Sequence, residues 1–237
     1  MRRPRLELPG IPLHITHRGV NRGATFLDDD DCAAYLHHLQ IAATAQGVRL
    51  HGYVLMTNHV HLLASADEAG AVSRTMQALG RRYVRALNAR HGRTGTLWEG
   101  RFKSCLVDND SYLLRCLRYI ELNPVRASMT DHPEMHRWSS VHAHLGIQSD
   151  PRLTPHPGYL ALGADPATRA KRYRTLLLEP LHAGDLADIR DHIRQERALG
   201  SPRFQAMVEK ALNRPVVVRP VGRPRAAGRP DSNGNVL

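Results

Sequence analysis

The sequence predicts an α+β fold, namely a ferredoxin-like split βαβ antiparallel sheet with helices on one face, followed by a C-terminal helical segment and a basic tail. In the first part of the chain, apolar residues alternate in some segments and recur with helical periodicity in others. These segments follow one another as strand, helix, strand, strand, helix, strand, which is the order of the split βαβ arrangement. From residue 151 onward the patterns are helical only, and from residue 214 the chain is rich in arginine and proline.

The first strand covers residues 13–19, where apolar and polar residues alternate up to Gly19. A helix over about residues 30–46 follows, with an apolar stripe formed by Cys32, Leu36, Leu39 and Ala43. Four aspartates at 28–31 precede it and suit the positive end of a helix dipole. They also fit a cation site, but a solvated helix start is the simpler interpretation.

Gly47 ends this helix, and two strands are predicted at 48–56 and 59–65, joined by a tight turn at Thr57 and Asn58. A second helix spans about 71–91 and carries several arginines beside its apolar stripe. The fourth strand is predicted over 101–107. A third helix, capped by Asn109 or Asp110, runs to about Leu122, where Pro124 stops it.

A short closing helix is predicted near 139–145. Three prolines between residues 151 and 157 mark a boundary, and helical patterns follow at about 165–178, 183–198 and 201–212. We therefore divide the chain into a domain over 1–150, a helical segment over 151–213 that either binds DNA or packs on the first domain, and a basic tail over 214–237. The tail is expected to be disordered alone and able to lie along a nucleic acid.

A formal net charge of +11 indicates a polyanionic partner. Only three of the 33 basic residues are lysines (Lys103, Lys171 and Lys210). Arginine pairs bidentately with phosphates and guanine edges and stacks on bases, which favours nucleic acid. Codon bias in a GC-rich genome is an alternative reason for arginine over lysine, but it does not explain the excess charge.

The three cysteines form no Cys-x-x-Cys pair, which is typical of buried thiols in a reducing compartment. The basic N-terminus is not followed by an apolar region like that of a signal peptide. No stretch approaches the roughly 18 apolar residues of a membrane span. We expect a cytoplasmic protein with no membrane partner.

Two pairs of residues point to chemistry. His59 and His61 would face the same side of a strand, and Tyr119 and Asn123 would share one face of a helix. Two neutral imidazoles and an amide oxygen make a divalent-metal site, with the phenol as a nucleophile. The alternatives are a histidine pair on a solvated strand face and a core tyrosine. Tyr112 lies seven residues before Tyr119 but lacks an asparagine partner, so a structural role is expected for it.

Four ordered motifs make the pattern specific: HITHRG at 14–19, MTNHVHLL at 56–63, LWEGRF at 97–102 and RYIELNPVRA at 118–127. Over about residues 11–145 the chain resembles the REP-associated tyrosine transposases, a group of HUH single-tyrosine transposases. The resemblance implies that residues 1–150 form the catalytic domain. It also implies that His59 and His61 bind the metal, that Asn123 completes the metal shell, and that Tyr119 attacks DNA.

The resemblance further implies cleavage and rejoining of single-stranded DNA at REP-like hairpins through a 5′-phosphotyrosine intermediate, by a monomer or homodimer. Because a phenol is a poor nucleophile at neutral pH, it needs local activation. The His-His-Asn set suits Mg²⁺ or Mn²⁺, and imidazole ligands favour Mn²⁺.

Basic residues outside this set have two interpretations. Arg18, Arg101 and Lys103 lie on strands expected near the site and either hold phosphates or keep the surface soluble. Arg223 and Arg225 belong to a VGRPR segment that resembles a minor-groove hook, although a flexible basic tail explains them equally well.

Two other functions compete with the transposase. A non-catalytic DNA-binding regulator would keep the HUH fold and its charge without cutting DNA. A zinc hydrolase of small substrates would need a further ligand at suitable spacing, and we find none. It would also leave the charge unexplained.

Overall fold

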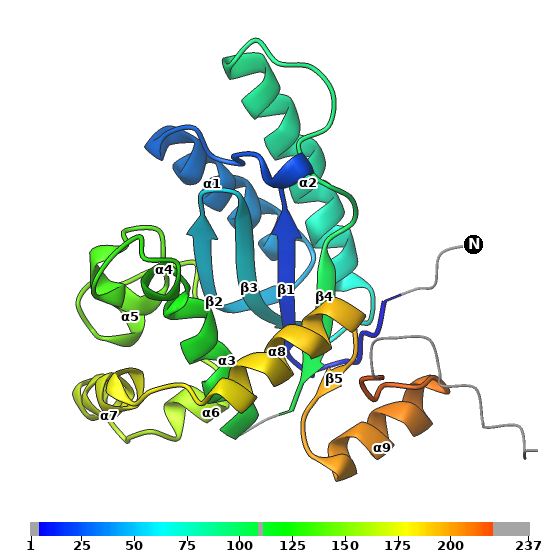
Figure 1. Ribbon diagram of the computed structural model, residues 1–237, viewed down its shortest axis with the longest axis vertical. Coiled ribbons are helices and arrows are strands. Elements are labelled where there is room, and N and C mark those ends of the chain that lie inside the picture. Colours follow the sequence, from blue (N-terminus) through cyan, green and yellow to red (C-terminus); the bar gives the residue numbers. More distant parts are fainter. Residues whose placement is uncertain (1–4, 109–110, 220–237) are drawn as a thin grey trace, which may run out of the picture.

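The computed structural model describes residues 5–108 and 111–219 and is built around one five-stranded sheet (Figure 1). The strand order is β2-β3-β1-β4-β5, where β1 is Leu13–Arg18, β2 Val48–Met56, β3 His59–Ala66, β4 Lys103–Val107 and β5 Ala198–Leu199. The first four strands pair antiparallel, and β5 pairs parallel with β4. The predicted split βαβ order and its antiparallel sheet are confirmed.

The two helices of the βαβ units, α1 (Asp29–Ala45) and α2 (Ala71–Arg90), pack against each other and against one face of the sheet. Alternate strand residues such as Ile15, Val60 and Leu62 are buried beneath them. Burial of these side chains removes apolar surface from water and gives the main stabilisation of this layer. The prediction of helices on one face of the sheet is therefore correct for α1 and α2.

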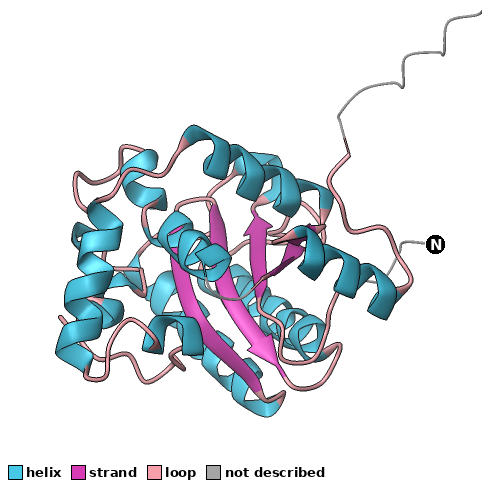
Figure 2. Cartoon of the chain, turned by 90° about the horizontal axis from the view of Figure 1, so that it is seen from below, coloured by secondary structure: helices cyan, strands magenta, loops and turns pink. Residues whose placement is uncertain are grey.

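The other face of the sheet is covered as well, by α3 (Ser111–Glu121) and α8 (Ala183–Gln195). Figure 1 shows α8, in yellow to orange, crossing in front of β1 and β4, and Figure 2 shows helices on both sides of the strands. A second buried cluster joins Val54, Leu63 and Cys105 of the sheet to α3 and α8. The fold thus has three layers, and the C-terminal helix α8 belongs to the third.

Some predicted boundaries were wrong. The helix predicted over 183–198 ends at Gln195, because Glu196 adopts a left-handed conformation (φ 53°) and the chain then forms β5. The fourth strand begins at Lys103 instead of 101. Pro124 does not end the helical structure: after α3 a short helix, α4 (Asn123–Arg126), holds the proline in its first turn. The predicted caps Asn109 and Asp110 lie outside the described residues.

The remaining described elements are short or peripheral. They are η1 (Val20–Arg22), η2 (Pro133–Met135), α5 (Val141–His144), α6 (Pro157–Leu160), α7 (Pro166–Leu178) and α9 (Pro202–Leu212). The predicted helices at 165–178 and 201–212 match α7 and α9. Within the described ranges, no helix combines the length and apolarity that a bilayer crossing requires.

Candidate functional site

The strand register places predicted site residues in two neighbouring rows on the α3 face. Across β1 and β3, Thr16 is opposite His61 and Arg18 is opposite His59. Lys103 of β4 is opposite Thr16 on the other side. Directly opposed residues of an antiparallel pair project to the same face. His59, His61, Arg18 and Lys103 therefore share the face that is turned away from α1 and α2.

Tyr119 of α3 and Asn123 of α4 meet this face. The Tyr119 ring centroid lies 5.7 Å from that of His61. Tyr119 and Asn123 line one cavity of about 620 Å³ together with His59 and His61. The other lining residues are Thr16, His17, Arg18, Glu99, Gly100, Arg101, Lys103, Arg190, Ile193 and Arg194. The structure thus brings all four predicted catalytic and metal residues, and Arg18, Arg101 and Lys103, into one cavity.

The hydrogen bonds of His59 leave one ring nitrogen available. Its Nδ1 lies 2.7 Å from Oδ1 of Asn58, whose amide nitrogen donates to the carbonyl of Arg22. Since an amide oxygen only accepts, Nδ1 of His59 is the donor and Nε2 carries the lone pair. Burial, with a smaller effect of Arg18, lowers the pKa of His59 to about 4. The ring is therefore neutral at pH 7 and can act as a metal ligand.

His61 has a comparable arrangement with a partner that the sequence did not assign. Its Nδ1 lies 2.8 Å from Nε2 of His14, a fully buried residue of β1. Burial, then the neighbouring His14 and His59, holds the pKa of His61 well below its usual value. Metal-binding histidines usually use their second nitrogen in such a contact, which fixes the ring. His14 alternates with Thr16 and Arg18 along β1, and that pattern was the available signal.

Tyr119 differs from most other tyrosines in the use of its hydroxyl. The hydroxyls of Tyr53, Tyr83, Tyr159 and Tyr173 each donate a hydrogen bond to a carboxylate or a carbonyl. In the described part of the chain no such bond involves the hydroxyl of Tyr119, whose ring is only 6 % exposed. A phenol that lines a cavity without a fixed partner is free to react with what enters it.

Arg126, in the same sequence motif, holds Tyr119 from the other side. Its guanidinium lies 4.3 Å from the centre of the Tyr119 ring and donates to the Tyr119 carbonyl over 2.9 Å. Tyr112 has a similar arginine, with Arg115 at 4.2 Å, but it lines a separate small hollow with residues of α8. The structure therefore does not bring Tyr112 to the histidines.

Glu121, between the two site residues of α3 and α4, points into the protein. Its carboxylate is fully buried and accepts hydrogen bonds from Ser140 (2.5 Å) and Tyr173 (2.7 Å), and it lies 2.6 Å from Nδ1 of His144. These contacts tie the end of α3 to α5 and α7. They fix the position from which Tyr119 and Asn123 face the cavity.

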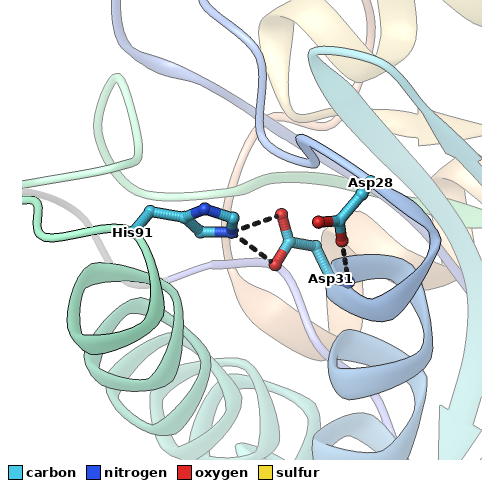
Figure 3. Close-up of side chains that lie close together, drawn as sticks. All are labelled: Asp28, Asp31 and His91. Carbon is cyan, nitrogen blue, oxygen red and sulfur yellow. Dashed lines mark hydrogen bonds and ion pairs between the residues drawn. The ribbon is translucent and has the colours of Figure 1, made fainter.

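The aspartate run forms a different cluster, at the junction of α1 and α2 (Figure 3). Asp28 caps α1 by accepting from the amide of Asp31. Arg90 lies 2.6 Å from Asp28 and 2.7 Å from Asp31, and Nε2 of His91 lies 2.9 Å from Asp31. Because the guanidinium of Arg90 already balances these carboxylates, the aspartates are explained as the start of α1, joined to α2 by ion pairs.

The remaining basic residues differ in whether the sequence predicted them and in whether the structure describes them. Arg190 and Arg194 of α8 line the cavity, which the sequence did not indicate because it does not show where α8 packs. Arg223 and Arg225 of the predicted hook lie outside the described residues.

Known proteins were compared with this chain by structure and by sequence. A REP-associated tyrosine transposase bound to a REP hairpin matches with a TM-score of 0.54 and 15 % identity, over 66 % of this chain and 98 % of the other. A protein from Deinococcus radiodurans R1, provisionally described as a transposase, matches with a TM-score of 0.37 and 19 % identity, over 57 % and 98 % of the two chains. No curated protein matched in sequence.

The first of these matches shows the shared fold. Residues 9–123 match the family model described as Transposase IS200 like, which includes all four predicted catalytic and metal residues. The resemblance inferred from the motifs is confirmed: residues 9–123 match the IS200-like transposase family model, and the fold is that of a REP-associated tyrosine transposase.

Proposed function

We propose that this protein is a metal-dependent HUH single-strand DNA endonuclease and transposase, which cuts and rejoins DNA at REP-like hairpins with Tyr119 as the nucleophile. The observation that carries the proposal is the position of the Tyr119 ring against His61, in one cavity with His59 and Asn123. All four residues lie together in one protomer, and we propose that a single protomer supplies the active site. The hairpin substrate rests on the sequence motifs and on the REP hairpin bound by the structural relative.

The donor set fits a divalent metal ion. His59 and His61 are neutral at pH 7 and keep their Nδ1 atoms engaged with Asn58 and His14. Asn123 lines the same cavity, and its amide oxygen, an acceptor, is the atom that would bind the metal. Mg²⁺ or Mn²⁺ held by His59, His61 and Asn123 would polarise the scissile phosphate and stabilise charge on its oxygens.

The chain's own residues account for the covalent step. The Tyr119 oxygen forms a bond to phosphorus and gives up its proton, while the bond from phosphorus to the 3′ oxygen breaks. The departing oxygen keeps the electron pair and takes a proton, which leaves a 3′-hydroxyl and a 5′-phosphotyrosine. Because the phosphodiester is retained, a 3′-hydroxyl can reverse the step without ATP. Arg18, Arg101, Lys103, Arg190 and Arg194 would hold the flanking phosphates.

The test uses single-stranded oligonucleotides from the repeats that flank the gene, incubated with the protein and Mn²⁺ and resolved on denaturing gels. We expect a covalent protein–DNA adduct that Tyr119→Phe abolishes while hairpin binding persists. Tyr112→Phe is the matched control, because Tyr112 lies on the same helix under a similar arginine and should leave the adduct unchanged. An adduct that survives Tyr119→Phe would contradict the proposal. Hairpin binding with no nicking in Mn²⁺ or Mg²⁺ would favour the non-catalytic regulator.

A further inference from the structure

A second cavity, of about 430 Å³, lies next to the candidate site; we call it the α2 cavity. Its walls come from α2 and from the segment before β4, and its lining residues are Arg5, His17, Ser73, Arg74, Met76, Gln77, Gly80, Arg81, Arg101 and Phe102. It shares His17 and Arg101 with the candidate site. The two cavities meet where the pairing of β1 with β4 stops, at Thr16 and Lys103.

The lining of the α2 cavity suits an apolar group carried by an anion. Met76 and Phe102 are buried and give it an apolar interior. Arg5, Arg74, Arg81 and Arg101 surround that interior. In the described part of the chain, Arg81 and Arg101 form no ion pair. Proteins that bind single-stranded nucleic acid combine apolar or aromatic surfaces for the bases with positive charge along the backbone.

Gly80 keeps part of this cavity open. It lies in the middle of the 20-residue helix α2, where glycine costs about 1 kcal/mol relative to alanine. A β-carbon at this position would meet only Nε1 of Trp98, at 3.9 Å, which is an ordinary contact. The packing of the protein itself therefore does not require glycine here. The missing side chain leaves room for something else.

Trp98 supplies a second, independent observation. Its indole is 8 % exposed and stacks on His17 at 3.9 Å, yet its Nε1 has no hydrogen-bond partner among the described residues. Buried polar atoms nearly always have a partner, so this donor calls for one. It is also the nearest described atom to the vacant position at Gly80. A carbonyl oxygen or ring nitrogen that entered beside Gly80 would provide the acceptor.

We propose that the α2 cavity binds one unpaired nucleobase of the DNA strand whose phosphate occupies the candidate site, with Trp98 as a hydrogen-bond donor and the surrounding arginines on the adjoining phosphates. The assignment rests on the proposed function, because it assumes a DNA strand in the neighbouring cavity. It adds a site that recognises the base itself, on the opposite face of the sheet from the histidines.

The test separates bases from phosphates. The Tyr119→Phe protein, without metal, is titrated with an oligothymidylate of roughly 20 nucleotides, longer than a typical single-strand site, and with an abasic strand of the same length. We expect the abasic strand to bind on the order of tenfold more weakly. Gly80→Leu should remove this difference by filling the cavity. Gly80→Ala, which adds only one carbon, should keep most of it.

A charge variant provides the matched control. Arg81→Gln should weaken both strands alike and reduce the slope of log affinity against log salt by about 1, as expected for one lost phosphate contact. Arg85→Gln removes an exposed arginine of the same helix that does not line the cavity, and it should change neither quantity. Thermal unfolding of each variant shows whether the fold is retained.

Trp98 gives a measurement that needs no cavity-filling variant. Its indole N–H signal in a ¹⁵N NMR spectrum, assigned with Trp138→Phe, should shift when oligothymidylate binds and stay in place with the abasic strand. The proposal is overturned if folded Gly80→Leu keeps the full preference for bases, or if the indole signal responds to both strands alike. Failure of the proposed function is read separately, from the absence of the Tyr119 adduct.

Discussion

The two faces of the sheet use the same strands for opposite purposes. On the α1 and α2 face, Val60 and Leu62 pack into an apolar core. On the α3 face, the alternate residues His59 and His61 line a cavity that carries positive charge. One strand thus supplies core residues on one side and candidate site residues on the other. Because side chains alternate between the faces, we expect that a residue of one face can be substituted without changing the other face.

The tyrosines show the same division. Tyr83, on the first face, has its ring against Tyr35 and donates its hydroxyl to the carbonyl of Thr25 over 2.6 Å. Burial raises the pKa of Tyr83 well above its usual value. Tyr119, on the second face, is also buried, but no described residue accepts a hydrogen bond from its hydroxyl. The hydroxyl of Tyr83 is committed to the fold, whereas Tyr119 lines the cavity with no such bond from its hydroxyl.

The largest expected effect comes from removing one hydroxyl on each face. Tyr119→Phe should reduce adduct formation by on the order of 10⁴-fold or more, as for other nucleophiles, while the free energy of unfolding changes little. Tyr83→Phe should leave the adduct and lower the free energy of unfolding by about 1–3 kcal/mol, because the Thr25 carbonyl loses its partner. Gel assays and urea unfolding of both variants measure the contrast. Equal effects of the two substitutions on adduct formation would refute the contrast between the two tyrosines.

His61→Gln should weaken Mn²⁺ binding by at least about a hundredfold, since loss of a ligand should exceed the effect of losing an outer partner. The glutamine amide can still donate to His14, so the fold should persist. Calorimetric titration gives the affinity. His37→Gln, an exposed position on α1, is the control and should bind Mn²⁺ as the parent does.

Leu62→Ala changes the neighbouring residue on the opposite face. Leu62 is 1 % exposed, so truncation should lower the free energy of unfolding by about 3 kcal/mol through lost burial and a new cavity. Mn²⁺ affinity per folded molecule should stay the same. A large fall in that affinity would mean that the two faces are coupled through the strand.

Acid should produce the smallest effect, and it acts through His14 on the α3 face. Burial, then Arg126, lowers the pKa of His14 to about 3 from 6.5, so the unfolded state takes up the proton first. Its stabilisation is complete above pH 6.5 and is lost as the pH falls toward 3. Without metal, this group alone should cost about 2 kcal/mol between pH 8 and pH 5. Urea unfolding should show a smaller difference for His14→Gln.

Much of this organisation could be predicted from the sequence. The alternation of apolar and polar residues predicted β2 and β3, and it predicted that His59 and His61 face away from Val60 and Leu62. The period of a strand can be read from neighbouring residues alone. The spacing of Tyr119 and Asn123 indicated a shared helix face, although the structure places them on two consecutive helices. The family motifs then connected the two pairs.

The rest depends on how distant segments pack, which local patterns do not encode. His14 becomes a partner of His61 only through the register of β1 and β3. Arg190 and Arg194 reach the cavity because α8 crosses β4 and β1. The predicted end of α8 was wrong because the pairing of β5 with β4 outweighs the helical propensity of Ala198 and Leu199.

The buried carboxylate of Glu121 limits how this protein can be shortened or recombined. Ser140, His144 and Tyr173 all lie beyond residue 123, where the family match ends, and Tyr173 belongs to α7. A protein shortened to the end of the family match would leave this buried carboxylate without its hydrogen-bond donors, at the end of the helix that carries Tyr119. Exchange of C-terminal halves between relatives would work only when the incoming half restores those donors.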